Sequence, residues 1–100
     1  MIVLAGTIDF DPAHAEAMMA AVAVVVEATR AEEGCLDYVI GPDPLIAGRL
    51  NLFERWEGDE HLGAHRKADH SRTFQRALGE CGMAGVSIDR YDGAAVTKIL

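Results

Sequence analysis

The sequence is poor in cysteine and in positive charge. Its two cysteines, Cys35 and Cys81, are too few and too far apart to form a disulfide framework, and neither has a paired metal-ligand spacing. We interpret both as reduced thiols. Nine Lys and Arg residues against sixteen Asp and Glu residues give a formal net charge of −7, with no basic cluster. Such a chain repels phosphate, so neither nucleic acid nor an anionic membrane is an expected partner.

Long apolar runs are also absent. Residues 2–5 are apolar, but no positive segment precedes them and the run stops too soon for a signal peptide or a membrane span. The expected location is therefore the cytoplasm. One hundred residues, half of them apolar, suit a single domain over residues 1–100. A chain this short leaves much of its surface uncovered, which favours association with a second copy.

Alternating apolar residues predict the strands. The predicted strands span residues 2–10, 35–40, 49–57 and 86–91, with a further strand at 94–100. Prolines and glycines in residues 41–48 predict a loop there, because proline interrupts strand pairing.

Two helices are predicted between these strands. The first runs from Pro12 to about Arg30, with Asp11 as its cap and Gly34 after its end. The second is capped by Asp59 and runs up to position 79.

The order of these elements is β-α-β-β-α-β with a C-terminal extension, which is typical of ferredoxin-like α+β folds. In that topology both helices lie on one face of an antiparallel sheet. The other face is predicted to carry Val3, Ala5, Val39 and Phe53, and these apolar side chains need a second cover. The simplest cover is the sheet of a second copy, which predicts a homodimer through this face.

The only tryptophan is the first candidate for a functional role. Trp56 could be a core or interface aromatic, or it could form a flat wall for an aromatic ligand and donate its indole N–H to a ligand carbonyl. Glu54 shares its face of the strand by the period of two. A carboxylate on an apolar face is either a paired structural residue or part of a site.

His65 follows on the second predicted helix at a distance that lets it approach Trp56. Its imidazole could take a proton from a phenol-like substrate or stabilise the resulting anion. His61 and His65 have the spacing of two metal ligands on a helix, but no third histidine or cysteine follows at a fitting place, so no metal site is expected. We interpret His61 and His70 as surface or support residues.

Other side chains are expected near the same space between sheet and helices. Tyr38 could line this space or pack in the core. Arg76 could reach the same space or be solvated. The apolar side chains that either line or fill it are Leu52, Leu62 and Phe74. No phosphate-binding glycine loop or Ser-His-Asp order is present, so an enzyme built here would work without a nucleotide or metal cofactor.

Three motifs, in this order and spacing, resemble the antibiotic biosynthesis monooxygenase (ABM) domain. They are EGCLDY at residues 33–38, FERW at residues 53–56 and AHRKADH at residues 64–70, followed by Phe74. The resemblance extends over the length of the chain. It implies a dimeric α+β barrel whose two sheets pack face to face.

The resemblance also implies cofactor-free oxidation of phenolic or quinol substrates by molecular oxygen. Trp56 matches the pocket tryptophan of the family and His65 its helix histidine, while Arg76 stands where some polyketide-oxidising members carry an arginine. Leu52 replaces an asparagine four residues before the tryptophan. Strand one, at residues 5–7, lacks the asparagine of the haem-degrading branch, which disfavours haem degradation.

These observations lead to two main hypotheses, with haem binding as a third alternative. The first is a small homodimeric monooxygenase that oxidises a quinol- or anthrone-like aromatic compound, with Trp56 as a wall and His65 as base or anion stabiliser. The second is a non-catalytic or stress-responsive dimer that holds a small ligand in the same cavity, because Leu52 stands in place of the asparagine.

Overall fold

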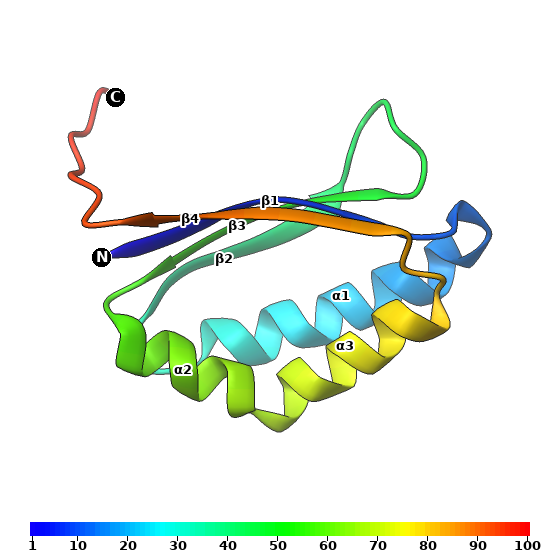
Figure 1. The fold of residues 1–100 in the computed structure, drawn as a ribbon, viewed down its shortest axis with the longest axis horizontal. Helices are drawn as coiled ribbons and strands as arrows, with labels where there is room; N and C mark the ends of the chain where they lie inside the picture. Colours follow the sequence, from blue (N-terminus) through cyan, green and yellow to red (C-terminus); the bar gives the residue numbers. More distant parts are fainter.

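The computed structural model describes all of residues 1–100 as a four-stranded sheet with its helices packed on one face (Figure 1). The elements are β1 (Ile2–Asp9), the 3-10 turn η1 (Pro12–His14), α1 (Ala15–Arg30), β2 (Cys35–Pro42), β3 (Arg49–Trp56), α2 (Asp59–Lys67), α3 (Asp69–Glu80) and β4 (Gly85–Asp92). The strand order is β2-β3-β1-β4 and every neighbouring pair is antiparallel. The predicted ferredoxin-like α+β class is therefore confirmed.

The register of β3 determines which side chains face the helices. Glu54 lies opposite Leu4 of β1 and opposite Tyr38 of β2, and Leu52 lies opposite Ile40. Side chains alternate along a strand, so these residues and Trp56 share the buried face of the sheet. The sheet therefore presents one carboxylate, one phenol and one indole to the helical layer.

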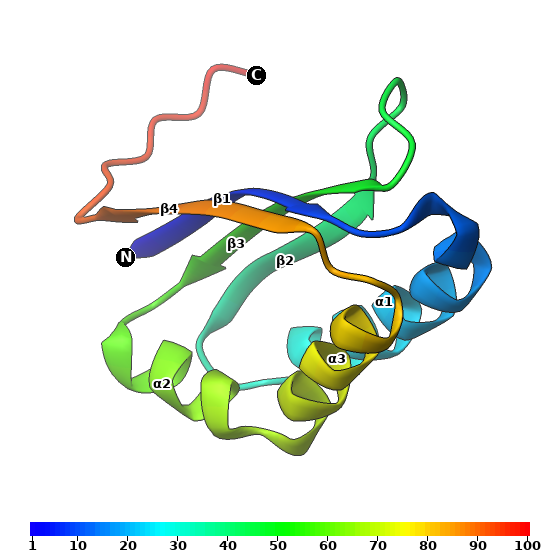
Figure 2. The same cartoon turned by 45° about the vertical axis from the view of Figure 1, so that its right-hand side comes forward.

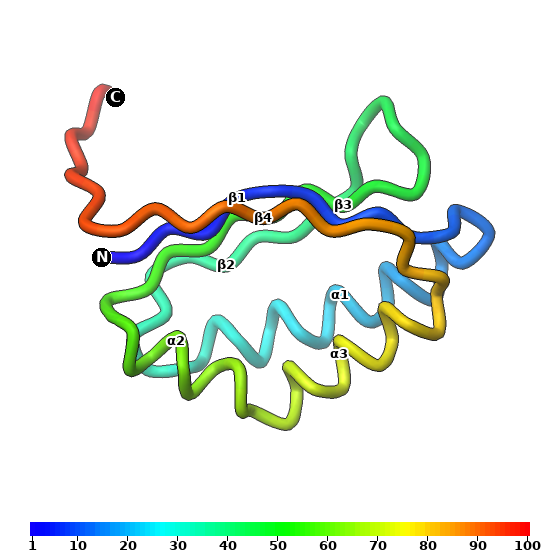
Figure 3. Tube along the Cα trace, viewed as in Figure 1, coloured from blue at the N-terminus to red at the C-terminus, as the bar shows by residue number.

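The helix predicted over residues 59–79 is wrong as a single element, because the chain breaks it at Ala68. Ala68 has an extended backbone, with φ −67° and ψ 145°. The hydroxyl of Ser71 donates to the carbonyl oxygen of His65 at 2.6 Å, and the Ala68 N–H donates to the same oxygen at 3.1 Å. These bonds satisfy the end of α2 and let α3 start in a new direction (Figure 3).

The structure confirms the predicted residues at the two ends of the first helix, but not the predicted cap of the second helix. The Asp11 carboxylate accepts from the Ala13 N–H at 2.9 Å, and Gly34 has a φ of 79°, as a residue that follows a helix end often does. Asp59 is not a cap: Gly58 takes the extended N-cap position and Asp59 is the first helical residue. Its charge still lies at the positive end of the helix dipole.

Two strand predictions need correction. β2 continues through Pro42, which is tolerated because β2 lies at the edge of the sheet and proline has no N–H to donate. Residues 94–100 form no strand. After Gly93 the chain turns away from the sheet on the side opposite the helices (Figure 1), and Val96, Ile99 and Leu100 stay exposed because no strand of this chain pairs with them.

No helix covers the second face of the sheet (Figure 2). Of the C-terminal segment, residues 94–97 lie beside Val3 and Phe53 on this face. Ala5, Phe53 and Val39 are adjacent across β1, β3 and β2, as predicted. Val39 and Phe53 are 48% and 40% exposed. No helix of the chain has the length and apolar character needed to cross a membrane.

Candidate active site

A cavity of about 280 Å³ lies between the sheet and the helices, and ten of its fourteen lining residues are hydrophobic. All four strands and all three α-helices contribute to its wall. Met83, Val86 and Ile88 are part of this wall and are 49%, 53% and 39% exposed, so the cavity reaches the surface along β4. The volume is close to the lower end of the range for small-molecule pockets.

Five of the eight predicted site residues line this cavity. They are Tyr38, Leu52, Glu54, His65 and Phe74. Phe74 and Leu78 are buried on the inner side of α3, one turn apart, which is the helical spacing expected for a face directed at the core.

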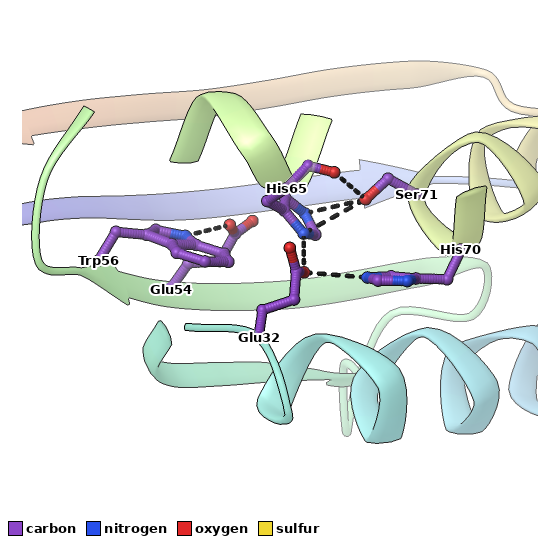
Figure 4. Close-up of polar contacts among 6 residues, drawn as sticks. All are labelled: Glu32, Glu54, Trp56, His65, His70 and Ser71. Carbon is purple, nitrogen blue, oxygen red and sulfur yellow. Dashed lines mark hydrogen bonds and ion pairs between the residues drawn. The ribbon is translucent and has the colours of Figure 1, made fainter. Parts of the chain in front are cut away.

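Trp56 does not form a wall of the cavity, contrary to our prediction. Its side chain is fully buried. The indole N–H donates to Glu54 Oε1 at 2.9 Å, and the ring lies 4.9 Å from the His65 ring, centre to centre. Trp56, at the end of β3, thus contacts and supports Glu54 and His65 (Figure 4), which line the cavity while Trp56 does not.

Leu62 and Arg76 also lie outside the cavity wall. Leu62 is buried in the hydrophobic core, one turn before His65 on α2. Arg76 is exposed because it comes two residues after Phe74, which places it about 200° round the helix from the buried face.

His65 is held by a carboxylate that the sequence analysis did not identify. Its Nδ1 lies 2.6 Å from Glu32 Oε2, and Glu32 is in the turn between α1 and β2 (Figure 4). A carboxylate only accepts hydrogen bonds, so the neutral ring carries its proton at Nδ1 and donates it to Glu32. The lone pair of the ring is then at Nε2. His65 as a whole residue is 8% exposed, and its ring centre lies 5.4 Å from that of Tyr38.

Two further residues of the network were missed. Ser71 places its hydroxyl 3.2 Å from His65 Nδ1, and His70 places Nε2 at 2.9 Å from the same Glu32 oxygen (Figure 4). His70 is therefore part of the interior network, and our prediction of a surface or support role described it only in part. His61 pairs with Glu57 at 3.7 Å, away from this network.

Burial, and after it negative charge, raises the pKa values of two groups at the cavity. Burial raises the pKa of the Glu54 carboxyl, and the hydrogen bond from Trp56 only partly offsets this. Burial also raises the pKa of Tyr38 well above its usual value, and the carboxylates of Glu54 and Glu32 raise it further. Tyr38 therefore stays a neutral phenol, and Glu54 takes up a proton more readily than an exposed glutamate.

The raised pKa of Glu54 predicts a pH-dependent stability difference between the wild type and Glu54→Gln. A carboxyl whose pKa is higher in the folded state stabilises the fold below its unfolded value of about 4.5, and this contribution is lost as the pH rises through the folded pKa. We expect the free energy of unfolding of the wild type to fall relative to the variant above pH 4.5. Urea unfolding followed by Trp56 fluorescence measures this; a pH-independent difference would contradict the expectation.

Comparison with known proteins agrees with this fold. The family model described as antibiotic biosynthesis monooxygenase matches residues 1–77. Among curated proteins, none is significantly similar in sequence.

Several solved structures, in contrast, are similar to this chain in fold. Protein PA3566 of Pseudomonas aeruginosa is 32% identical over 94% of each chain, with a TM-score of 0.83. A conserved protein of Methanosarcina mazei Go1 is 26% identical over 90% of this chain and 89% of its own, with a TM-score of 0.81. A candidate antibiotic biosynthesis monooxygenase of Deinococcus radiodurans is 23% identical over 100% and 99%, with a TM-score of 0.89. The chain belongs to the antibiotic biosynthesis monooxygenase family.

Proposed function

We propose that this protein is a monooxygenase of its family that oxidises a small quinol- or anthrone-like aromatic compound with molecular oxygen and without a cofactor. The observation that carries the proposal is the buried imidazole of His65 at the wall of a mostly apolar cavity. Apolar walls favour a flat aromatic ligand, and one imidazole is enough to take its acidic proton. The volume of about 280 Å³ favours a small fused-ring compound.

The first step is transfer of a substrate proton to His65 Nε2. The imidazolium formed is paired with the Glu32 carboxylate at 2.6 Å from Nδ1, so proton transfer creates no unpaired positive charge. The substrate anion lies beside the imidazolium, which stabilises it in turn. Glu32 acts as a positioning residue because it fixes the ring and its tautomer.

The second step uses oxygen as the oxidant. The substrate anion gives one electron to O₂, and the carbon radical and superoxide combine to form a C–O bond. The imidazolium returns its proton to the resulting peroxide. Loss of water from this peroxide leaves a ketone, so that a CH₂ group and O₂ become C=O and H₂O. The protein contributes binding, deprotonation and a mostly apolar cavity wall.

We also propose that two copies pack through their open sheet faces. Val39 and Phe53 are exposed and adjacent on this face, and no helix covers them. A second copy of the same face is the partner that matches their apolar character, and isologous pairing of one face is the commonest form of homodimer.

A second candidate function is non-catalytic binding of a small apolar ligand. Leu52 is 6% exposed and lines the cavity, at the position where the resemblance places an asparagine in oxidising members. Leucine cannot donate a hydrogen bond to a substrate oxygen. Ligand binding without oxygen consumption would favour this candidate, whereas stoichiometric product formation would rule it out.

Replacement of His65 by alanine is expected to lower oxygen uptake by about 10²-fold or more, the scale of lost general-base catalysis. Uptake is measured with a panel of quinols and anthrones in buffer free of metal and flavin, with the uncatalysed rate subtracted. His61→Ala is the matched control, because His61 is on the same helix and outside the cavity wall. A wild-type rate no higher than the uncatalysed rate would refute the enzyme function, and an unchanged rate in His65→Ala would refute the role of His65.

Replacement of Phe53 by glutamate is expected to convert a dimer into a monomer, since it places a charge in the proposed interface. Sedimentation velocity measures the mass in solution. Val24→Glu is the control: Val24 is 62% exposed on α1, in the helical layer that covers the other face of the sheet. A monomeric wild type, or a dimer that Phe53→Glu leaves intact, would contradict the proposed interface.

A further inference from the structure

Three side chains from different elements of the fold lie together beside the cavity. Glu32 comes from the turn after α1, His65 from α2 and His70 from α3, and one ligand atom of each lies within 4.8 Å of the others. Glu32 Oε2 is 2.6 Å from His65 Nδ1 and 2.9 Å from His70 Nε2 (Figure 4). The side chains are 16%, 10% and 23% exposed, respectively, so the cluster is largely shielded from solvent.

The charge of this cluster is not balanced by any fixed cation. No lysine or arginine forms an ion pair with Glu32; its partners in the structure are the two histidines. With neutral imidazoles the cluster carries one negative charge, and Glu54 is close enough for Glu32 to raise its pKa. A chain with a formal net charge of −7 adds to this negative potential. The site therefore has the electrostatic character of a cation site.

We propose that Glu32, His65 and His70 bind a divalent transition-metal ion of the zinc type. The ligand atoms would be Glu32 Oε2, His65 Nδ1 and His70 Nε2. Two imidazoles and one carboxylate are a donor set that suits Zn²⁺, with the fourth position open to water or to a ligand in the cavity. This proposal goes beyond the oxidation proposed above and does not depend on it.

The geometry needs only a local adjustment to admit the ion. Metal–ligand distances of about 2.0–2.2 Å place tetrahedral ligand atoms roughly 3.3 Å apart. The Glu32 oxygen is closer than this to both rings, so the carboxylate must withdraw by several tenths of an ångström. Glu32 is outside regular secondary structure, where such a movement is least hindered. The Ser71 hydroxyl lies 3.2 Å from His65 Nδ1 and 3.4 Å from Nε2, and it donates to the His65 carbonyl oxygen, so it packs beside the ring as an outer-shell neighbour.

The ion would have a consequence for the cavity. Coordination of His65 Nδ1 leaves the ring proton on Nε2, so the imidazole can no longer accept a proton from a substrate. Metal binding and base catalysis at His65 therefore exclude each other. The ion acts as an inhibitor of the proposed oxidation, and its removal by a chelator restores the free base.

Zinc titration by calorimetry tests the site on protein that carries no histidine tag and has been stripped of metal. We expect one Zn²⁺ per chain. His70→Ala and Glu32→Gln should each weaken the affinity by at least about 10²-fold, because loss of a direct ligand costs at least as much as loss of an outer-shell partner. His61→Ala is the matched control: it removes a histidine that faces one carboxylate, Glu57, without a third ligand. Circular dichroism checks that each variant is folded.

Cobalt substitution gives a second readout that does not depend on activity. Co²⁺ should give the visible absorption of a four- or five-coordinate ion in the wild type and in His61→Ala, and lose it in His70→Ala. No zinc binding by the wild type, or equal binding by all variants, would overturn the proposal. Zinc binding in a protein that consumes no oxygen would refute the proposed oxidation and leave the metal site standing.

Discussion

The hydrogen bond between Glu32 and His65 is the interaction on which the site depends. It joins the turn after α1 to the last turn of α2 across 33 residues of sequence, at a distance of 2.6 Å. A buried imidazole without a partner would cost free energy, and the carboxylate removes that cost while fixing the ring beside the cavity. The same oxygen also binds His70, so one carboxylate ties together the three helices that cover the sheet. Both the proposed base and the proposed metal site follow from this contact.

The sheet provides the other half of the site, because every second side chain of β3 faces the helices. Leu52, Glu54 and Trp56 alternate with outward residues and face the helices. Trp56 is the least exposed of the three and donates its indole N–H to Glu54, so its effect on a ligand in the cavity passes through Glu54 and His65. This arrangement assigns the tryptophan to the support of the site, and it leaves the ligand surface to Tyr38, Leu52 and the apolar side chains of α3 and β4.

Local patterns were sufficient to predict the fold and the sheet side of the site. Alternation in residues 49–57 placed Glu54 and Trp56 on one face, and the order of the elements predicted the ferredoxin-like topology. The helix break at Ala68 was not predictable, because it depends on the Ser71 side chain reaching the carbonyl of His65. Glu32 was missed for a similar reason: it lies in an irregular turn, and only the tertiary fold brings it to His65. The expected strand at 94–100 failed because apolar residues alone do not supply a pairing partner.

In the proposed mechanism, His65 contacts the acidic oxygen of a ligand in the cavity. The most direct test is a crystal structure of the metal-free protein with a phenol that oxygen does not oxidise. We expect the phenolic oxygen within about 2.6–3.2 Å of His65 Nε2, with the Glu32 carboxylate still at Nδ1. A ligand bound outside the cavity, or one whose oxygen contacts Tyr38 or Glu54 and not His65, would contradict this role of His65.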